Sequence, residues 1–252
     1  MSASPFRPSV GWTDSLPPLH KFQADFQPAA LRRRMTSVFA GAWLPVVQAR
    51  EARRLAALCK VAPRLHLGCG EHPKPGWLNI DFWPPSQRSP RDIGPLVVNH
   101  DLTRGLPLAD DTCCEIYSSH FLEHLSAIEG ARLLSDCYRV LRPTGRLRTC
   151  VPDFARLARA YVENDYDYFA PLHRIYSGRI GDGVENSDTI MDAVNNGLYQ
   201  FGEHHCMYDM EKLERLLLAI GFSQVTRSSF DATIDGDWDA REHFSLYIDA
   251  IK

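Results

Sequence analysis

The 252-residue sequence has no strong excess of charge, no long apolar run and no C-x-x-C pair of cysteines. Lysine and arginine total 28 against 31 aspartates and glutamates, a formal net charge of −3, which argues against a general nucleic-acid-binding protein. No stretch approaches the ~20 apolar residues of a transmembrane helix. The seven cysteines are odd in number, which disfavours a disulfide framework or a zinc knuckle. A reducing, cytoplasmic location is therefore expected.

The small net charge is the sum of two segments with opposite charge. Residues 28–64 hold eight basic and one acidic side chain, a net of +7, and residues 153–211 hold four basic and eleven acidic, a net of −7. The prolines and the helical apolar pattern of residues 1–60 predict an extended N-terminal arm followed by a helical cap of one or two helices, broken near Pro45. The basic cap can attract the acidic segment, an anionic acceptor or a membrane surface, where it would make peripheral contact.

A basic stretch at 32–34 precedes a mostly apolar one at 35–47, an order that superficially resembles a twin-arginine export signal. The interruption at Pro45 and the charged helical pattern that follows favour a capping helix instead. Nothing in the sequence predicts an oligomeric state.

Residues 61–252 alternate short apolar runs with helical stretches, which is typical of a mostly parallel sheet with helices on both faces. Ser126 and Glu129 form a capping box at the start of one helix, and Asp153 and Asp209 can cap two more. The predicted strands are 64–67, 77–80, 96–99, 115–119, 146–151, 223–229 and 244–251.

The sharpest motif is the G-x-G turn Gly68-Cys69-Gly70, which directly follows the first predicted strand. Glycine permits a tight turn and close approach of backbone to a ligand at the carboxyl end of a strand. A dinucleotide-binding fold would place a third glycine where this chain has 71–73, Glu-His-Pro, so the motif disfavours NAD or FAD. Asp81 ends the second strand, where a carboxylate can accept hydrogen bonds from both ribose hydroxyls; an ordinary loop aspartate is the alternative.

Several further elements follow in order: Asp101-Leu102, the Leu-Pro turn at 106–107, the segment 118–125 (Ser-Ser-His-Phe-Leu-Glu-His-Leu) and 139–145 (Arg-Val-Leu-Arg-Pro-Thr-Gly). Together with the G-x-G turn, this set resembles class I S-adenosylmethionine-dependent methyltransferases, especially the group called methyltransferase type 11. The resemblance covers about 64–153. It implies a Rossmann-like fold of seven strands with an antiparallel last strand and S-adenosyl-L-methionine as the cofactor.

The resemblance also implies roles for particular residues. The strand end and turn would approach the methionine part of the cofactor, Asp81 the ribose, Asp101 and Leu102 the adenine, while Ser119 and His120 would lie near the reacting methyl. The interval from the turn to Asp81 is shorter than usual for the family and leaves little room for a crossover helix. The expected cofactor-binding residues are Leu67, Gly68, Cys69, Gly70, Asp81, Asp101, Leu102 and Ser119.

Residues 120–124 also match H-x-x-E-H, an inverted zinc-protease signature, for which Glu203, His204 and His205 could supply a further ligand. The motif ends a strand and precedes the Ser126 cap, so little helix is available to bring its two histidines together. We therefore predict no metal site. His120 and His204 are the general-base candidates, and His205 is expected to satisfy a polar turn.

The sequence thus predicts a methyltransferase that uses a small-molecule acceptor, whose reacting oxygen, nitrogen or carbon is left open. The alternatives are a non-catalytic interaction protein that keeps the fold and, less favoured, a zinc hydrolase. Residues 154–208 form an aromatic-rich insertion that can either cover the acceptor or form a small core of its own.

Overall fold

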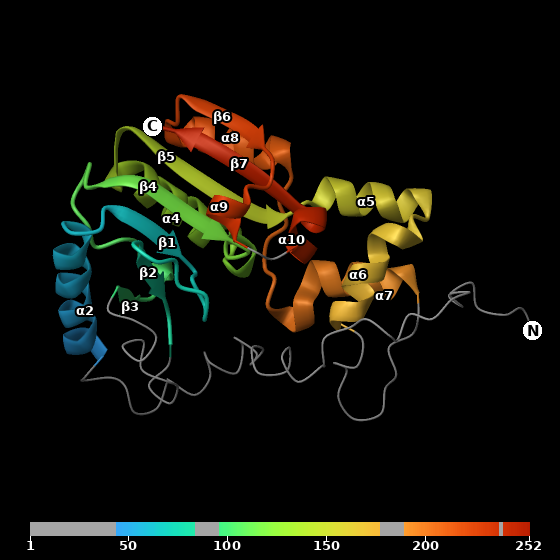
Figure 1. Cartoon of the computed structure of the whole chain (residues 1–252), viewed down its shortest axis with the longest axis horizontal. Coiled ribbons are helices and arrows are strands. Elements are labelled where there is room, and N and C mark those ends of the chain that lie inside the picture. Colours follow the sequence, from blue (N-terminus) through green and yellow to red (C-terminus); the bar gives the residue numbers. More distant parts are fainter. Residues whose placement is uncertain (1–43, 84–95, 177–188, 237–238) are drawn as a thin grey trace, which may run out of the picture.

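The computed structural model describes residues 44–83, 96–176, 189–236 and 239–252. Within these ranges seven strands form one sheet in the order β3-β2-β1-β4-β5-β7-β6 (Figure 1). All neighbouring strands pair in parallel except β7, which is antiparallel to both of its neighbours. The predicted α/β fold with an antiparallel last strand is confirmed. The strands are β1 (Arg64–Leu67), β2 (Leu78–Asp81), β3 (Val97–Asn99), β4 (Cys113–Ser119), β5 (Leu141–Pro152), β6 (Gln224–Ser228) and β7 (Ser245–Ile251).

One face of the sheet is apolar and is covered by α4 (Ala127–Val140) and α8 (Met210–Ile220). Ser126 caps α4 in a capping box with Glu129, and Asp209 caps α8 through the backbone N–H of Lys212 at 2.8 Å, as the sequence predicts. The strand β5 begins at Leu141, directly after α4, rather than at the predicted 146. It begins early because Leu141 pairs with Cys113 of β4, ahead of a register shift between Cys113 and Glu115.

The opposite face of the sheet carries polar side chains. Arg148 of β5 is only 2% exposed and donates hydrogen bonds to Asp235, in the short helix α9 (Ala232–Asp235), and to Asp249 of β7. A buried charge is tolerated only when it is paired and hydrogen-bonded. This ion-pair network therefore fastens α9 to the sheet.

The connection from β1 to β2 crosses the sheet without a helix and comprises residues 68–77. Asn79, which is 2% exposed, fixes it: Oδ1 accepts from Lys74 N at 2.7 Å, and Nδ2 donates to the carbonyls of Lys74 and Trp77. His66 Nδ1 lies 2.9 Å from the same Oδ1. One buried amide thus performs the positioning that a crossover helix performs in longer connections.

The helix α2 (Leu44–Cys59) is the described part of the predicted N-terminal cap, and it packs Leu55 and Cys59 into the main core. Pro45 lies in its first turn, where proline is well tolerated. The proline-rich arm, the start of the predicted cap and the basic stretch at 32–34 lie outside the described residues. Among the described residues, no helix is both long and apolar enough to cross a membrane.

The described part of the 154–208 insertion consists mainly of α5 (Phe154–Glu163), α6 (Tyr166–Tyr176) and α7 (Ile190–Tyr199), beyond the carboxyl end of β5 (Figure 1). The Asp153 side chain caps α5 as predicted, accepting from Arg156 N at 3.1 Å. Phe169 is fully buried in a small separate core of these helices. The insertion therefore has a core of its own; a covering role over the acceptor stays a prediction.

Candidate functional site

The G-x-G turn and Asp81 lie side by side at the carboxyl ends of β1 and β2. Gly68 N and Cys69 N donate to the Ile80 carbonyl at 2.9 and 3.3 Å, which fixes the turn against β2. Gly70 N then donates to Asp81 Oδ2 at 2.6 Å, and Phe82 N donates to Oδ1 at 2.6 Å. The Asp81 carboxylate therefore holds the turn as well as ending the strand.

The two glycines of the turn serve different purposes. Both have positive φ, +66° at Gly68 and +52° at Gly70, a region that strains other residues. A Cβ on Gly68 would lie 2.4 Å from the Phe121 ring, so Phe121 already occupies the space that a side chain at this position would need. A Cβ on Gly70 would meet no atom of the described residues within 4 Å. Of these two positions, Gly70 is the one that leaves space for a ligand close to the backbone.

The neighbouring predicted residues Leu67 and Cys69 are buried, at 1% and 3% exposure. Leu67 belongs to the main core, and Cys69 packs with Trp83 and Val97. Burial raises the pKa of the Cys69 thiol, so the thiol is neutral at physiological pH. These two residues can contact a ligand only through their main-chain atoms.

Asp101 follows β3 and caps the short 3₁₀ helix η2 (Leu102–Arg104). Its Oδ1 accepts from Thr103 N at 3.0 Å, and Arg104 Nε lies 3.8 Å from Oδ2. Leu102, 4% exposed, points into the main core. Asp101 therefore stands near the same edge of the sheet as Asp81, whereas the Leu102 side chain is occupied with packing.

Ser119 ends β4, and His120 follows with a φ of +48°, a left-handed conformation that is uncommon outside glycine. Both ring nitrogens of His120 are engaged: Nε2 lies 2.8 Å from Ser245 Oγ and Nδ1 lies 3.1 Å from Glu123 Oε1. Burial opposes the imidazolium, but Cys150 and Glu123 outweigh it and raise the pKa of His120 to about 9. The ring is therefore held as a charged partner of Glu123.

Glu123 lies in the 3₁₀ helix η3 (Leu122–His124) and is 1% exposed. Within the described ranges neither of its carboxylate oxygens accepts a hydrogen bond of normal geometry. Burial opposes its charge, but the nearby imidazoles, His120 above all, outweigh it and lower the pKa of the carboxyl to about 2. Glu123 is thus an ionised, buried carboxylate with unused acceptor capacity.

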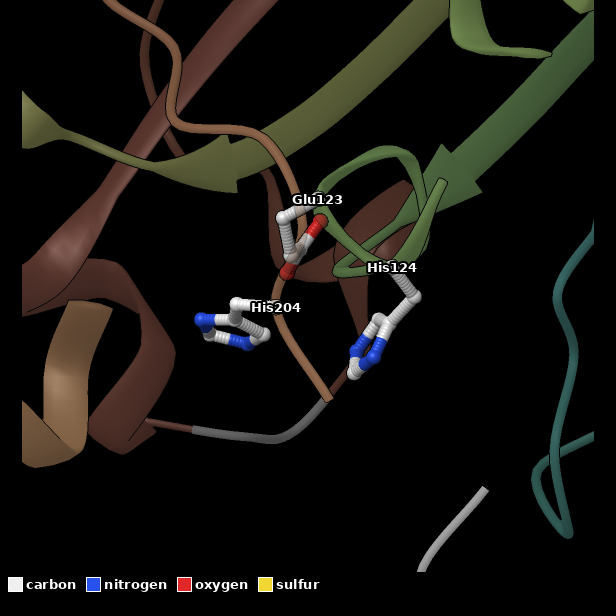
Figure 2. A group of neighbouring side chains, drawn as sticks. All are labelled: Glu123, His124 and His204. Atoms are coloured by element: carbon white, nitrogen blue, oxygen red, sulfur yellow. The ribbon is translucent and has the colours of Figure 1, made fainter. Parts of the chain in front are cut away.

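His204 reaches this carboxylate from the turn before α8 (Figure 2). It is 8% exposed, its Nδ1 lies 3.0 Å from the Gly197 carbonyl, and its ring is 4.9 Å from that of His124. Burial lowers the pKa of His204 to about 4 although Glu123 opposes the shift. The turn is held in place by Glu123 itself, whose backbone carbonyl accepts from His205 N at 2.7 Å.

The structure brings together part of what the sequence predicts. Gly70 and Asp81 are in contact, and His120 and His204 both lie beside Glu123. The ligand set predicted for an H-x-x-E-H metal site does not form among the described residues, because His124 groups with Glu123 and His204 rather than with His120. His205 is exposed, in keeping with the polar-turn interpretation.

Other partners in the site were not predicted. Ser245 and Cys150 contact His120 from β7 and β5, and Phe121 fills the space above Gly68. Each of these contacts joins residues that lie far apart in the sequence, so no local sequence pattern could have predicted it.

Comparison with known proteins gives one family match: residues 65–149 match the model described as a methyltransferase domain. No curated protein matches the sequence. Solved structures that resemble the chain include an S-adenosylmethionine-dependent methyltransferase from Archaeoglobus fulgidus, 17% identical with a TM-score of 0.45, which covers 88% of this chain and 99% of its own. Another is 1,6-didemethyltoxoflavin-N1-methyltransferase from Burkholderia thailandensis with bound S-adenosylhomocysteine, 15% identical with a TM-score of 0.44, covering 95% and 92%.

These structural likenesses are too distant to carry an argument about this chain. The match over residues 65–149 and the antiparallel β7 expected from the sequence carry more weight. Residues 65–149 thus match a methyltransferase domain, and the sheet around them has the antiparallel last strand that the resemblance to class I S-adenosylmethionine-dependent methyltransferases implies.

Proposed function

We propose that the protein transfers the methyl group of S-adenosylmethionine to a small-molecule acceptor. The observation that carries the proposal is the Gly70 turn, where an open position with positive φ lies directly beside the Asp81 carboxylate. In open α/β sheets, ligands bind outside the carboxyl ends of strands at the point where the strand order reverses. Here that point lies between β1 and β4, beside the turn.

The residues at this edge fit the cofactor. The space beyond Gly70 accepts a ligand against the backbone. A carboxylate has about four lone-pair sites, so one that accepts two backbone hydrogen bonds can also accept from ribose hydroxyls. We propose that the main chain of 67–70 holds the methionine part, that Asp81 holds the ribose, and that Asp101 and the main chain of Leu102 hold the adenine.

When bound, the cofactor supplies an electrophilic methyl group on a sulfonium that is already a good leaving group. The protein then contributes mainly orientation, by holding cofactor and acceptor in line. Ser119 ends β4, and the side chains of His120 and His204 lie beside Glu123 just past it. We propose that these residues face the acceptor. Since both nitrogens of His120 are engaged, His204 is the better general base of the two predicted candidates.

Calorimetric titration with S-adenosylmethionine and with S-adenosylhomocysteine tests the proposal. Both should bind, and Asp81→Ala should weaken both strongly while leaving the circular-dichroism spectrum unchanged. Asp110→Ala is the matched control, because that carboxylate is 71% exposed and remote from the turn. Failure of both ligands to bind the unmodified chain would refute the proposal.

A turnover screen with labelled cofactor against sugars, quinones, polyamines and small acids then identifies the acceptor class. Binding of both ligands without turnover on any of these, together with a stable complex recovered with a partner chain, would favour the non-catalytic alternative.

A further inference from the structure

We propose that Glu123, His124 and His204 bind one divalent transition-metal ion. Each residue offers one ligand atom, and the three atoms lie within 4.8 Å of one another. Figure 2 shows the Glu123 carboxylate and the two rings arranged around a common point, with His204 coming from a separate segment of the chain. A tetrahedral ion ~2.1 Å from each ligand atom would place these atoms ~3.4 Å apart. Ligand atoms that now lie as much as 4.8 Å apart therefore need to approach each other by up to about 1.4 Å, through small side-chain rotations.

The Glu123 carboxylate is the independent evidence for a ligand. It is 1% exposed, yet Oε2 accepts no hydrogen bond from any described residue. A buried polar group without such a partner costs about 1–3 kcal/mol, and native proteins commonly satisfy such a group with a bound water or ion. His120 pairs with Oε1 only at 3.1 Å, so it does not satisfy the second oxygen.

The contacts of His204 suit a metal ligand as well. Its Nδ1 is 3.0 Å from the Gly197 carbonyl, so Nδ1 carries the proton and donates to that oxygen. The ring is then fixed in the tautomer whose Nε2 has a free lone pair. Metal-bound histidines almost always donate their second nitrogen to a carbonyl or carboxylate in this way.

The donor set indicates which class of ion would bind. Two imidazoles and one carboxylate suit zinc, iron, cobalt or manganese, whereas calcium and magnesium prefer oxygen ligands throughout. Three protein ligands leave at least one coordination position for another molecule, as in catalytic rather than structural sites. This differs from the H-x-x-E-H arrangement, because the glutamate itself is a ligand and His120 is not.

The site lies just past the end of β4, where the methyl acceptor is proposed to bind. With the ion in place His204 is a ligand rather than a base, and the ion polarises an acceptor group at its open position. Only this last role depends on the proposed methyl transfer; the metal site itself does not. Its failure and the failure of cofactor binding are measured separately.

The test uses the full-length chain, stripped of metal with a chelator and then titrated with Zn²⁺ by calorimetry and with Co²⁺ by visible absorption. We expect one equivalent of each ion per chain, and Co²⁺ bands without the thiolate charge-transfer absorption that cysteine binding produces. Glu123→Gln and His204→Gln should each weaken binding by roughly 100-fold or more, the effect of removing a ligand being at least that of removing its supporting contact. His205→Gln, next to His204 but exposed, should bind as the unmodified chain does.

Three results would overturn the proposal: no saturable binding of either ion, unchanged affinity in the ligand variants, or strong thiolate absorption in the Co²⁺ complex. If Glu123→Gln does not fold, His124→Gln decides the question, because that side chain is only partly buried. Titration of S-adenosylmethionine into the metal-free chain shows independently whether the cofactor site is intact.

Discussion

Alanine at each glycine of the G-x-G turn should separate the part of this turn that serves the fold from the part that serves the ligand. Both positions have positive φ, so either substitution pays the cost of a left-handed alanine, about 1–2 kcal/mol. The surroundings differ. A Cβ on Gly68 would lie 2.4 Å from Cγ and Cδ2 of Phe121 and 2.6 Å from its Cβ, whereas a Cβ on Gly70 would meet nothing within 4 Å.

The Phe121 atoms in question include its Cβ, which cannot swing aside as the end of a flexible side chain could. Overpacking of this kind adds about 1–3 kcal/mol. Gly68→Ala should therefore lower the free energy of unfolding by about 2–5 kcal/mol, and Gly70→Ala by only about 1–2 kcal/mol. Urea unfolding followed by circular dichroism measures both, with the slope of the transition checked for constancy.

Cofactor affinity should follow the opposite order. If S-adenosylmethionine occupies the space beyond Gly70, Gly70→Ala should lower its affinity by about tenfold or more, equivalent to ~1.4 kcal/mol. Gly68→Ala should have the smaller effect on affinity under conditions where it is folded. Equal losses of stability would refute the role of Phe121, and an unchanged affinity of Gly70→Ala would show that the ligand does not approach this turn.

The remaining predictions concern buried polar groups and helix caps. Arg148→Met should cost about 3–5 kcal/mol in urea unfolding, because it leaves Asp235 buried without its counter-charge; a loss below 1 kcal/mol would mean that α9 is not fastened through this pair. Asn79→Ala should cost about 2–4 kcal/mol, because it leaves Lys74 N–H and the Trp77 carbonyl of the crossover unpaired and removes one of the two hydrogen bonds to the Lys74 carbonyl. Asn79→Asp, which keeps an acceptor but loses both donors, should also be destabilising, and a neutral result would contradict the assigned contacts. Ser126→Ala should cost about 1 kcal/mol through loss of the α4 cap, measured by the same unfolding transition.

Much of the fold could be predicted because local signals agreed with one another. The capping residues Ser126, Asp153 and Asp209 marked three helix starts correctly, since a cap is a contact within three residues of sequence. The seven strands were found for a similar reason: short apolar runs bounded by turns fix a strand locally. The start of β5 was missed because pairing with β4, a contact between distant segments, extends it to Leu141.

The site was less predictable because it is assembled from segments that are far apart in the sequence. Gly70 and Asp81 could be placed at the same edge of the sheet, since Gly70 follows β1 and Asp81 ends the adjacent β2. The approach of His204 to Glu123 could not, because it depends on a backbone contact between residues about eighty positions apart, Glu123 O with His205 N. For the same reason the sequence pattern groups Glu123 and His124 with His120 in one motif. In the structure Glu123 and His124 group instead with His204, which comes from a distant segment.

The short crossover shows how one residue can decide whether a local expectation holds. A parallel connection normally needs a dozen residues or more, which made the ribose-binding role of Asp81 the least secure of the predicted cofactor contacts. In the structure the shorter loop pairs β2 with β1 in register, Leu65 with Leu78, and Asn79 bonds to the loop's backbone from a position buried between two apolar residues. A polar residue within a buried strand would ordinarily weaken the strand. Here it satisfies backbone groups that a crossover helix would have satisfied itself, so Asp81 reaches the edge of the sheet beside Gly70. The role of Asn79 thus follows from backbone hydrogen bonding, and an Asn79 variant should disturb cofactor binding through Asp81 even though Asn79 contacts no ligand.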